Sequence, residues 1–341
     1  MKANNEYIAL RKQDYRYGEY KIVPIRFEDR LLIMKWRNEQ MYHLRQNKAL
    51  TTKQQDDYFK EVVAQLFRKK QPEQLLFSYL KNDKCIGYGG LVHINWEEKT
   101  AELSFIMQTD LEKKEFDLHW HNFIKMIEKV AFYDLNFNSI FTYAYNLRPH
   151  LYPMLEKAGF IQINKLHNEL QIEGKAIDVI IHQKTNPINQ IIIHSASIDD
   201  MQLIFDWSND DLVRKQSYQT KKIRWEDHKK WYQQKINDNN SLFLIAKINN
   251  MPMGLLRFDL QDEFAIIGIS IDKHFRGKSL AVPLLIAGTN FYFNKFDKPV
   301  KAYIKKTNTA SVNAFANAGF SYNQDEIVKG VESYIYIKTK N

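Results

Sequence analysis

The chain contains the stretch Ile269-Ser-Ile-Asp-Lys-His-Phe-Arg-Gly-Lys-Ser-Leu-Ala281, which has the pattern of an apolar strand, a short basic loop and the start of a helix. The first amide N–H groups of a helix have no partner within it, and the positive end of the helix dipole lies beside them. Gly277 lets the backbone approach a ligand closely, while Arg276 and Lys278 supply charges that suit phosphate. The stretch therefore predicts an anion site where the strand passes into the helix.

Length and composition place the chain among folded proteins with two domains. A chain of 341 residues is longer than a domain with one ordinary hydrophobic core. A content of 44% hydrophobic and 26% charged residues is typical of a globular protein. The net charge of +9 favours anionic partners, and phosphorylated small molecules satisfy it as well as nucleic acid does. Basic and aromatic residues interleave only faintly, as in Tyr292–Lys298, so we expect no nucleic-acid partner.

Cysteine usage and the lack of long apolar runs indicate where the protein works. Cys85 is the single cysteine, which excludes a disulfide within the chain and a cysteine-based zinc site, and we expect no metal. The first residues lack the apolar core of a signal peptide, and no run of about 18 apolar residues follows. We therefore expect a cytoplasmic protein without a membrane partner.

The pattern of the first half recurs after a polar turn at Thr185-Asn-Pro-Ile-Asn189. Each half has the order β-α-α-β-β-β-α-β-α-β, which predicts an α/β (α+β) fold with a mixed, mostly antiparallel, twisted sheet flanked by helices. A period of about 160–170 residues is too long for a solenoid, so we expect tandem domains at residues 1–185 and 188–341. Three motif pairs carry the repeat: Trp36-Arg-Asn38 with Trp207-Ser-Asn209, Ile86-Gly87 with Met253-Gly254, and Ala158-Gly-Phe160 with Ala318-Gly-Phe320.

Shorter signals predict individual elements. Turn signals at Lys81-Asn-Asp-Lys84 and at Asn249-Asn250 each predict a hairpin. Gly159 and Gly319 each predict the end of a helix, because glycine is the common residue just past a helix C-terminus. Residues 1–19 are polar and rich in Tyr and Arg, and we expect an irregular lead-in there.

This order of elements resembles the GNAT family of acyl-CoA N-acyltransferases, in two copies that span nearly the whole chain. In that family a loop of pattern Arg/Gln-x-x-Gly-x-Gly/Ala holds the pyrophosphate of acetyl-CoA on its amides. The second copy has Arg276-x-x-Ser279-x-Ala281 after its fourth strand, with Ser279 in place of the family glycine, and Asn308-x-x-Ser311 further on. The resemblance implies acetyl-CoA as co-substrate, held by Ile269, Ser270, Ile271, Arg276, Gly277, Lys278, Ser279, Leu280, Ala281, Asn308 and Ser311.

The strand before the loop has a second role in this family. The resemblance implies a bulge near Gly268–Ile271 that separates two strands, so that pantetheine pairs with the free strand edge. A backbone N–H near Ile269 to Ile271 would then polarise the thioester carbonyl as charge develops on its oxygen.

The first copy differs at the corresponding loop. Gln108-Thr-Asp-Leu-Glu-Lys-Lys-Glu-Phe-Asp117 lacks the glycine and carries four carboxylates where the pyrophosphate would lie. Asn146 and Gly159-Phe160 retain the later part of the signature. We therefore expect a GNAT-like first domain with a weakened or lost CoA site.

The acceptor amine must be neutral to attack the thioester, and a carboxylate or a histidine is the usual base. Family members often carry a Glu on the fourth strand, which the first copy has as Glu102, whereas the second copy has Ile266 there. The remaining candidates are His228 on the substrate-side helix and the carboxylates before the strand, namely Asp259, Asp262 and, as our choice, Glu263.

The family tyrosine that protonates the leaving thiolate is also missing. Phe315 occupies its position in the second copy and Leu155 in the first. Either another group protonates the thiolate, or it leaves unprotonated, since a thiol has a pKa near 8.5.

A finer resemblance lies between Phe205 and Trp231, where the second copy is similar to GNAT enzymes of bacterial sugar-nucleotide pathways that make pseudaminic and legionaminic acids. It implies an amino group on a nucleotide-linked deoxysugar as acceptor, with Trp207, Asn209 and Arg214 as substrate-binding residues. The basic net charge agrees with an anionic amino sugar.

Two alternatives stay open, and the sequence also allows a homodimer. The pair of copies could be a non-catalytic or regulatory CoA-binding module, which the missing Glu and Tyr favour. Alternatively, the acceptor could be a protein or another small amine such as an aminoglycoside-like compound, although the basic charge opposes cationic acceptors.

Overall fold

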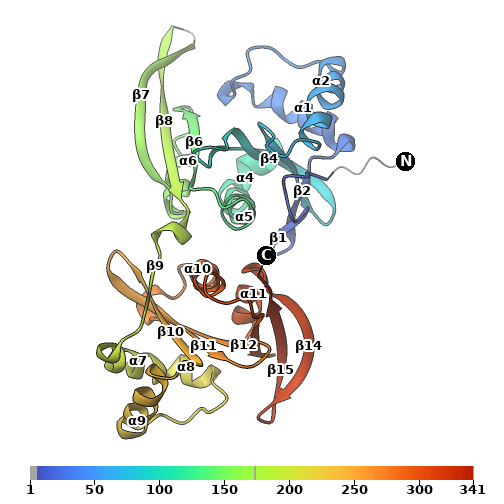
Figure 1. The fold of residues 1–341 in the computed structure, drawn as a ribbon. Helices are drawn as coiled ribbons and strands as arrows, with labels where there is room; N and C mark the ends of the chain where they lie inside the picture. Colours follow the sequence, from blue (N-terminus) through green and yellow to red (C-terminus); the bar gives the residue numbers. More distant parts are fainter. Residues whose placement is uncertain (1–5, 173, 341) are drawn as a thin grey trace. The chain divides into compact units, whose positions relative to one another are not determined.

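The computed structural model describes residues 6–172 and 174–340 and divides the chain into two compact units, with the division between Asn186 and Pro187 (Figure 1). Each unit contains one mixed sheet with helices packed against it, which confirms the predicted fold class. None of the described helices is long and apolar enough to cross a membrane.

Among the described residues of the first unit, eight strands form one sheet in the order β1-β2-β3-β4-β5-β6-β8-β7. The strands are β1 (Tyr15–Tyr17), β2 (Tyr20–Pro24), β3 (Leu75–Lys81), β4 (Lys84–Asn95), β5 (Thr100–Met107), β6 (Ser139–Tyr145), β7 (Ile161–Ile172) and β8 (Lys175–Thr185). The α-helices are α1 (Arg30–Glu39), α2 (Thr52–Tyr58), α3 (Ala64–Leu66), α4 (Thr109–Lys114), α5 (Phe116–Glu128) and α6 (Leu151–Lys157). Short 3-10 or π-helical segments are η1 (Phe27–Asp29), η2 (Met41–His43), η3 (Phe59–Val63) and η4 (Lys129–Asp134).

In the part of the second unit that the structure describes, seven strands form a sheet in the order β14-β15-β13-β12-β11-β10-β9. The strands are β9 (Ile192–Ser195), β10 (Ser241–Ile248), β11 (Met251–Leu260), β12 (Ala265–Ile271), β13 (Val300–Lys305), β14 (Ser321–Val328) and β15 (Val331–Lys338). The α-helices are α7 (Met201–Ser208), α8 (Asp211–Gln216), α9 (Trp225–Ile236), α10 (Ala281–Phe293) and α11 (Thr309–Asn317). The 3-10 segments are η5 (Pro187–Gln190), η6 (Ile198–Asp200) and η7 (Lys273–Phe275).

Both predicted hairpin turns are confirmed. Asn82 and Asp83 join β3 to β4 with φ of +48° and +62°, and Asn249 and Asn250 join β10 to β11 with φ of +50° and +63°. Two successive left-handed residues match the right-handed twist of the flanking strands, and Asn and Asp tolerate that conformation better than most residues.

The repeated Ala-Gly-Phe motif ends a helix in both units. Gly159 and Gly319 follow α6 and α11 with φ of +88° and +87°. In each unit a lysine of the last strand donates to the carbonyl of the alanine, from Lys184 in the first unit and from Lys338, at 2.9 Å, in the second. The motif therefore closes a helix C-terminus.

Helices cover both faces of the second sheet (Figure 1). On one face, α10 and α11 bury the larger core, where Tyr292 stacks on Phe258 with ring centroids 4.7 Å apart. At Gly288, α10 lies so close to β11 that a Cβ atom would come within 2.4 Å of Leu256 Cδ2. On the other face, α7 and α9 form a smaller cluster around Trp207, and its described members include no residue of β12 or β13. That face of β12 and β13 is therefore not covered by the described residues of the cluster around Trp207.

The expected irregular lead-in takes part in the first sheet instead. Residues 15–17 form the edge strand β1, which pairs with β2. Tyr7 is fully buried, and its hydroxyl both donates to the carbonyl and accepts from the N–H of Leu76 at 2.9 Å. Aromatic burial thus orders a segment whose polar composition predicted a loop.

Candidate active site

Two parallel strands of the second sheet separate along most of their length. β12 and β13 pair at Ala265 with Val300 and at Ile266 with Lys301, and no further pair follows among the described residues, although both strands continue. The first sheet has a similar opening, because β5 and β6 pair from Thr100 opposite Ser139 to Glu102 opposite Phe141, with no further pair in the described part of these strands. The opening is therefore a repeated feature of the fold.

The separated part of β12 presents free backbone groups to the opening. Ala265 N–H donates to the carbonyl of Pro299 at 2.8 Å, so the backbone N–H of Ala265 points toward β13. Because this direction alternates along a strand, the N–H groups of Ile269 and Ile271 point to the same side. The Ile271 carbonyl there accepts a hydrogen bond from Arg276 Nε at 2.8 Å.

The opening forms without the predicted bulge. The ladder between β11 and β12 runs in continuous register from Gly254 opposite Ile271 to Leu260 opposite Ala265. The register shift of this region lies one strand further, between β10 and β11 at Ala246 and Lys247. The expectation of a bulge at Gly268–Ile271 is therefore wrong, and the strands separate by divergence alone.

The loop after β12 contains two residues in the left-handed conformation. Gly277 has φ of +74° and Ser279 has φ of +58°, so the serine adopts a conformation that suits glycine. A Cβ atom on Gly277 would meet nothing within 4 Å, so the loop is open on that side. Ser279 thus adopts a left-handed conformation although it is not glycine.

Helix α10 presents its first amides to this loop. Its first backbone hydrogen bond runs from Leu284 N–H to the Leu280 carbonyl at 3.0 Å, so the N–H groups of Ala281 and Val282 precede the ladder. Pro283 has no N–H to satisfy, which suits the first turn of a helix. The N-terminus of α10 therefore retains the donors of an anion site.

Asn308 and Ser311 lie together at the start of α11. Asn308 Oδ1 accepts the N–H of Ser311 at 3.2 Å and so caps the helix. The Asn-x-x-Ser pattern thus has a structural role here in addition to any contact with a ligand.

The loop is tied to the corner between α7 and α8. Arg276 Nη1 lies 2.9 Å from Asp210 Oδ1, and Trp207 Nε1 donates to Asp272 Oδ2 at 2.8 Å. Burial raises the pKa of Asp210, but hydrogen bonds from Arg276 and from helix N–H groups outweigh it and bring the pKa below its usual value. The loop after β12 and the corner between α7 and α8 are therefore fixed to one another.

The three predicted substrate-binding residues all make contacts within the chain. Trp207 is buried, and its indole N–H donates to Asp272 in the loop after β12. Asn209 donates to the Ile223 carbonyl at 3.0 Å and accepts the Ile223 N–H at 2.8 Å. Asn38 makes the same pair of bonds with Leu50, so this is the structural basis of the repeated Trp-x-Asn motif.

Arg214 holds the loop that follows α8. Its Nη1 donates to the carbonyls of Gln219 and Lys221 at 3.2 and 3.4 Å, and its Nη2 donates to Ser217 Oγ at 3.0 Å. Burial lowers the pKa of Arg214. Arg214 and Asn209 therefore both hold this loop, and their contact with a substrate stays a prediction.

The loop between α8 and α9 is anchored at its start on the last strands of the sheet. Lys305 Nζ, at the end of β13, donates to the carbonyls of Ser217 and Lys215 at 2.7 and 3.1 Å. The hydroxyls of Tyr218 and of Ser333 on β15 lie 2.8 Å apart. The loop consequently crosses from the β13 side to α9 and borders the opening.

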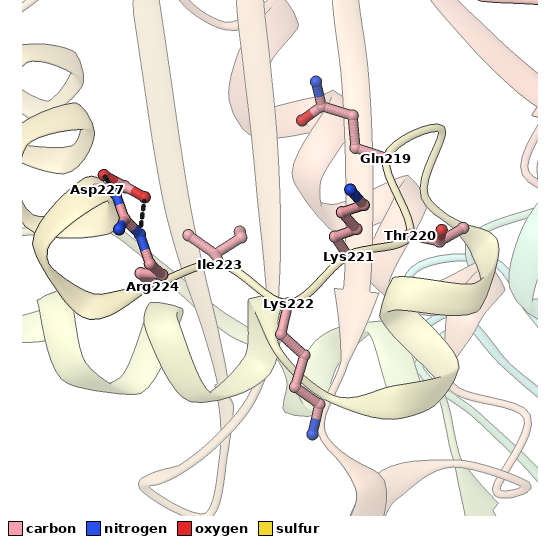
Figure 2. Close-up of a pocket in the computed structure, with 7 residues that line it drawn as sticks. All are labelled: Gln219, Thr220, Lys221, Lys222, Ile223, Arg224 and Asp227. Carbon is pink, nitrogen blue, oxygen red and sulfur yellow. Dashed lines mark hydrogen bonds and ion pairs between the residues drawn. The ribbon is translucent and has the colours of Figure 1, made fainter.

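This loop forms an open, basic hollow with a volume of about 550 Å³. Figure 2 shows the side chains that line it. Arg224 pairs with Asp227 at 2.8 Å, whereas Lys221 and Lys222 extend in opposite directions. Lys222 lies 3.1 Å from Asp211, and no carboxylate of the described residues pairs with Lys221. The hollow is lined by Gln219, Thr220, Lys221, Lys222, Ile223, Arg224 and Asp227.

Two of the predicted bases lie away from the opening. His228 is 1% exposed and packs among Phe205, Trp225 and Trp231, with its Nε2 3.1 Å from the Met201 carbonyl. Burial lowers its pKa, so it is a neutral core residue.

Glu263 is exposed in the turn before β12, at the far end of that strand from the loop. Seven residues of strand separate the two ends, which is about 20 Å. Glu263 is close to β12 in the sequence but lies a full strand length from the loop that follows β12.

Glu102, the third predicted base, is held by an arginine in the first unit. Both of its carboxylate oxygens accept from Arg45 Nη2, at 3.0 and 3.1 Å, and His93 lies 3.8 Å away. Burial raises the pKa of Glu102, although Arg45 and His93 oppose the rise. Glu102 thus lies in the first unit with its side chain 12% exposed and bound by Arg45, and its role as a base stays a prediction.

The loop of the first unit is replaced by a helix and a buried ion pair. Residues Thr109–Lys114 form α4, and Glu112 Oε1 of that helix lies 3.9 Å from Arg148 Nη1, with side chains only 9% and 11% exposed. Burial lowers the pKa of Arg148. This arrangement gives a phosphate no open loop like the one after β12 in the second unit.

The position of Asn308 is taken by Arg148 in the first unit, and not by Asn146 as the sequence suggested. Arg148 and Asn308 each precede the glycine of their own Ala-Gly-Phe motif by the same interval, since 159 − 148 = 319 − 308 = 11. Strand registers agree, because Ile140 faces Ala101 as Val300 faces Ala265. The CoA signature of the first unit is therefore lost at two positions.

Among the residues that the structure describes, no group of three or more His, Cys, Asp or Glu side chains is arranged to hold a metal ion.

Comparison with known families gives a match in each half. Residues 22–181 match the family described as "Acetyltransferase (GNAT) domain", and residues 190–321 match a second family of the same description.

Individual relatives are more distant. The uncharacterized protein MJ1062 of Methanocaldococcus jannaschii is 28% identical over 189 residues, which are 51% of this chain and 37% of that protein, so the match spans about a third of its length. Among solved structures, the chain is similar to AAC(6')-Ib in complex with ribostamycin and coenzyme A, at 14% identity and a TM-score of 0.40 over 44% of this chain and 94% of that one. It is also similar to a chimera of spermidine N-acetyltransferase SpeG from Vibrio cholerae and hSSAT, at 17% identity and a TM-score of 0.44 over 50% and 97%.

Proposed function

The chain belongs to the GNAT acetyltransferase family, with one domain of that family in each half, and from this premise we propose that the second domain transfers an acetyl group from acetyl-CoA to a primary amine. The observation that carries the proposal is the open edge of β12, which leads into a loop with two left-handed residues, Gly277 and Ser279. Such an edge suits an extended pantetheine chain, and such a loop suits a pyrophosphate.

Residue roles follow from these two surfaces. The edge formed by Ile269, Ser270 and Ile271 takes the pantetheine, and the loop from Arg276 to Ala281 takes the pyrophosphate, with Lys278 as a further cation. Asn308 and Ser311 border the pantetheine at the start of α11. Acetyl-CoA supplies the acetyl thioester, and the Ile269 N–H stabilises its carbonyl oxygen as negative charge develops there.

In this proposal the first domain binds no CoA. Glu112 and Arg148 occupy the corresponding place with a buried ion pair, and neutralising either partner leaves the other charge buried. The first domain then contributes fold and surface rather than catalysis.

We further propose an anionic acceptor, with a nucleotide-linked amino sugar as the best candidate. The basic hollow of the α8–α9 loop supports this class, since Lys221 has no acidic partner among the described residues, whereas Lys222 and Arg224 pair with Asp211 and Asp227. A diphosphate bound there would leave the sugar amine free to enter the opening, whereas a polycationic amine would be repelled.

A second candidate function is a non-catalytic CoA-binding module. The observation that favours it is the loss of both family catalytic residues in the second domain, where Ile266 and Phe315 stand in place of Glu and Tyr.

Release of CoA thiol from acetyl-CoA separates these candidates. The protein is offered a nucleoside-diphosphate-linked aminodeoxysugar, the free amino sugar, spermidine and an aminoglycoside. We expect the nucleotide-linked sugar to give the lowest KM, and Lys221→Gln to raise that KM by about tenfold with little effect on the free sugar.

The matched control is Lys329→Gln, in the turn between β14 and β15 of the same domain, which should leave every KM unchanged. Thiol release that no amine increases would favour the binding module. A preference for spermidine would contradict the anionic acceptor but not acetyl transfer.

A further inference from the structure

The face of β12 opposite the main core has an open space at Gly268. Ile267, Ile269 and Ile271 belong to the core beneath α10. Since successive side chains point to opposite faces, Ile266, Gly268 and Ser270 lie on the α7–α9 side. A Cβ atom built on Gly268 would meet nothing within 4 Å, so the space above this residue is empty of protein atoms.

One carboxylate lies beside this space on the neighbouring strand. On β11, Arg257 is opposite Gly268 and Asp259 is opposite Ile266. The Arg257 guanidinium lies 5.9 Å from the ring centroid of Trp231 on α9, which places it on the α7–α9 side. Asp259 Oδ2 pairs with Arg257 Nε at 3.0 Å and is 24% exposed, so it shares that side and remains accessible.

Tyr303 marks the other side of the space. β13 pairs with β12 at Lys301 opposite Ile266, and the next residue of β13 on the same face is Tyr303. The two strands have separated at this point, so the space above Gly268 lies at the mouth of the opening. An amine placed there would reach a thioester lying along the edge of β12.

The two domains carry a carboxylate at this place on different strands. Gly87 faces Met107 in the first sheet as Gly254 faces Ile271 in the second, and the ladders continue in step from these pairs. Five pairs further on, Val92 faces Glu102 in the first sheet and Asp259 faces Ile266 in the second. The carboxylate lost from the fourth strand is therefore present directly across the ladder, at a Cβ separation of about 5 Å.

We propose that Asp259 is the general base of the second domain and that the space above Gly268 receives the acceptor amine. The proposal rests on the function proposed above. The amine nitrogen forms its bond to the thioester carbonyl carbon, and its proton passes to the Asp259 carboxylate. The carbon–sulfur bond then breaks, its electron pair leaves with the thiolate, and the thiolate takes a proton from water. Asp259 returns its proton to water.

Asp259→Asn tests the assignment, with thiol release measured in the presence and absence of the best amine of the panel. We expect kcat to fall about 10²-fold or more, with the Kd for acetyl-CoA unchanged. Asp259→Asn combined with Ile266→Glu returns a carboxylate to the strand position of Glu102 and should restore much of the rate. Asp297→Asn, an exposed aspartate paired with Lys340, controls for the loss of one carboxylate.

A second variant tests the pocket without touching a charge. Gly268→Val fills the open space and should raise the KM for the amine about tenfold or more while leaving the Kd for acetyl-CoA unchanged. A β-branched residue also suits a strand, so folding should be retained.

The possible results separate this inference from the proposed function. Equal rates of wild type and Asp259→Asn, or a loss of rate on Glu263→Gln in place of Asp259→Asn, would overturn the assignment of the base and leave acetyl transfer standing. A wild type that binds acetyl-CoA but whose thiol release is not increased by any amine of the panel would contradict acetyl transfer and the base assignment together.

Discussion

Asp210 Oδ1 lies 2.9 Å from Arg276 Nη1 and also accepts the N–H groups of Leu212 and Val213 at 3.0 and 3.2 Å. One carboxylate thus caps α8 and fixes the first residue of the proposed pyrophosphate loop. The acceptor-side helices and the CoA-side loop are therefore positioned together before any ligand arrives, which reduces the cost of ordering the loop on binding.

Asp210→Asn should loosen the loop without uncapping α8, because Asn is as good an N-cap as Asp. The variant removes an ion pair whose side chains are 22% and 25% exposed, and we expect a loss of about 1 kcal/mol in stability. Hydrogen exchange followed by mass spectrometry should show faster exchange over residues 272–281. Asp325→Asn, which breaks the more exposed pair with Lys306, should leave that segment unchanged, and equal effects of both variants would refute the coupling.

Ser279 tests whether the left-handed loop conformation matters for the ligand. Ser279→Gly relieves a residue at φ of +58° and should bind acetyl-CoA at least as tightly as wild type. Ser279→Val places a β-branched side chain there and should weaken binding more than tenfold. Lys329→Val, at φ of +49° in the β14–β15 turn, should cost similar stability while leaving the Kd for acetyl-CoA unchanged. If Ser279→Val binds like wild type, the loop is not the pyrophosphate site.

Arg148→Asn gives the first domain the residue that the second has at Asn308. It leaves the Glu112 carboxylate buried without its partner, so urea unfolding should show a loss of about 3 kcal/mol or more. Adding Glu112→Gln should recover most of that loss, because the remaining group is then uncharged. Wild-type stability of the single variant would mean that the ion pair does not hold this part of the first domain.

His43 makes the first domain sensitive to acid. Its burial, helped by the nearby Arg148 charge, lowers the pKa of His43 to about 3, whereas the unfolded chain titrates near 6.5. At a pH between these two pKa values the imidazole is protonated in the unfolded state and neutral in the folded state, so the free energy of unfolding falls as pH drops below about 6.5. At pH 5 the loss is about 2 kcal/mol.

His43→Phe should remove this part of the decrease in unfolding free energy between pH 7 and pH 5. His167→Gln, which changes an exposed histidine of the same domain, should retain the decrease. An equal decrease in wild type and His43→Phe would show that the imidazole titrates normally.

The features that the sequence predicted correctly depend on local chemistry. Paired left-handed residues at Asn82-Asp83 and Asn249-Asn250 make the hairpins, and the repeat of short motifs indicates two copies of one fold. The strand, basic loop and helix of residues 269–281 likewise follow from residues adjacent in the chain.

What the sequence left open depends on contacts between segments that are distant in the chain. Asp259 is one of three candidate carboxylates before the strand, and only the ladder shows that it lies opposite Ile266, whereas Glu263 lies in the turn before β12. His228 has the residue type of a base but packs into an aromatic cluster that its helical position alone does not disclose. The Trp-x-Asn motif recurs for the same kind of reason, since Asn209 holds the backbone of Ile223 fourteen residues later.

Titration calorimetry of the full chain with acetyl-CoA tests the central claim most directly. We predict one site per chain for wild type, no binding by Gly277→Glu, and unchanged binding by Gly330→Glu. Gly330 is the matched control because it also has a positive φ, +79°, and open space around its Cβ position, but lies in the β14–β15 turn. Two sites per chain, no binding by wild type, or undiminished binding by Gly277→Glu would contradict the assignment of the CoA site to the β12–α10 loop of the second domain.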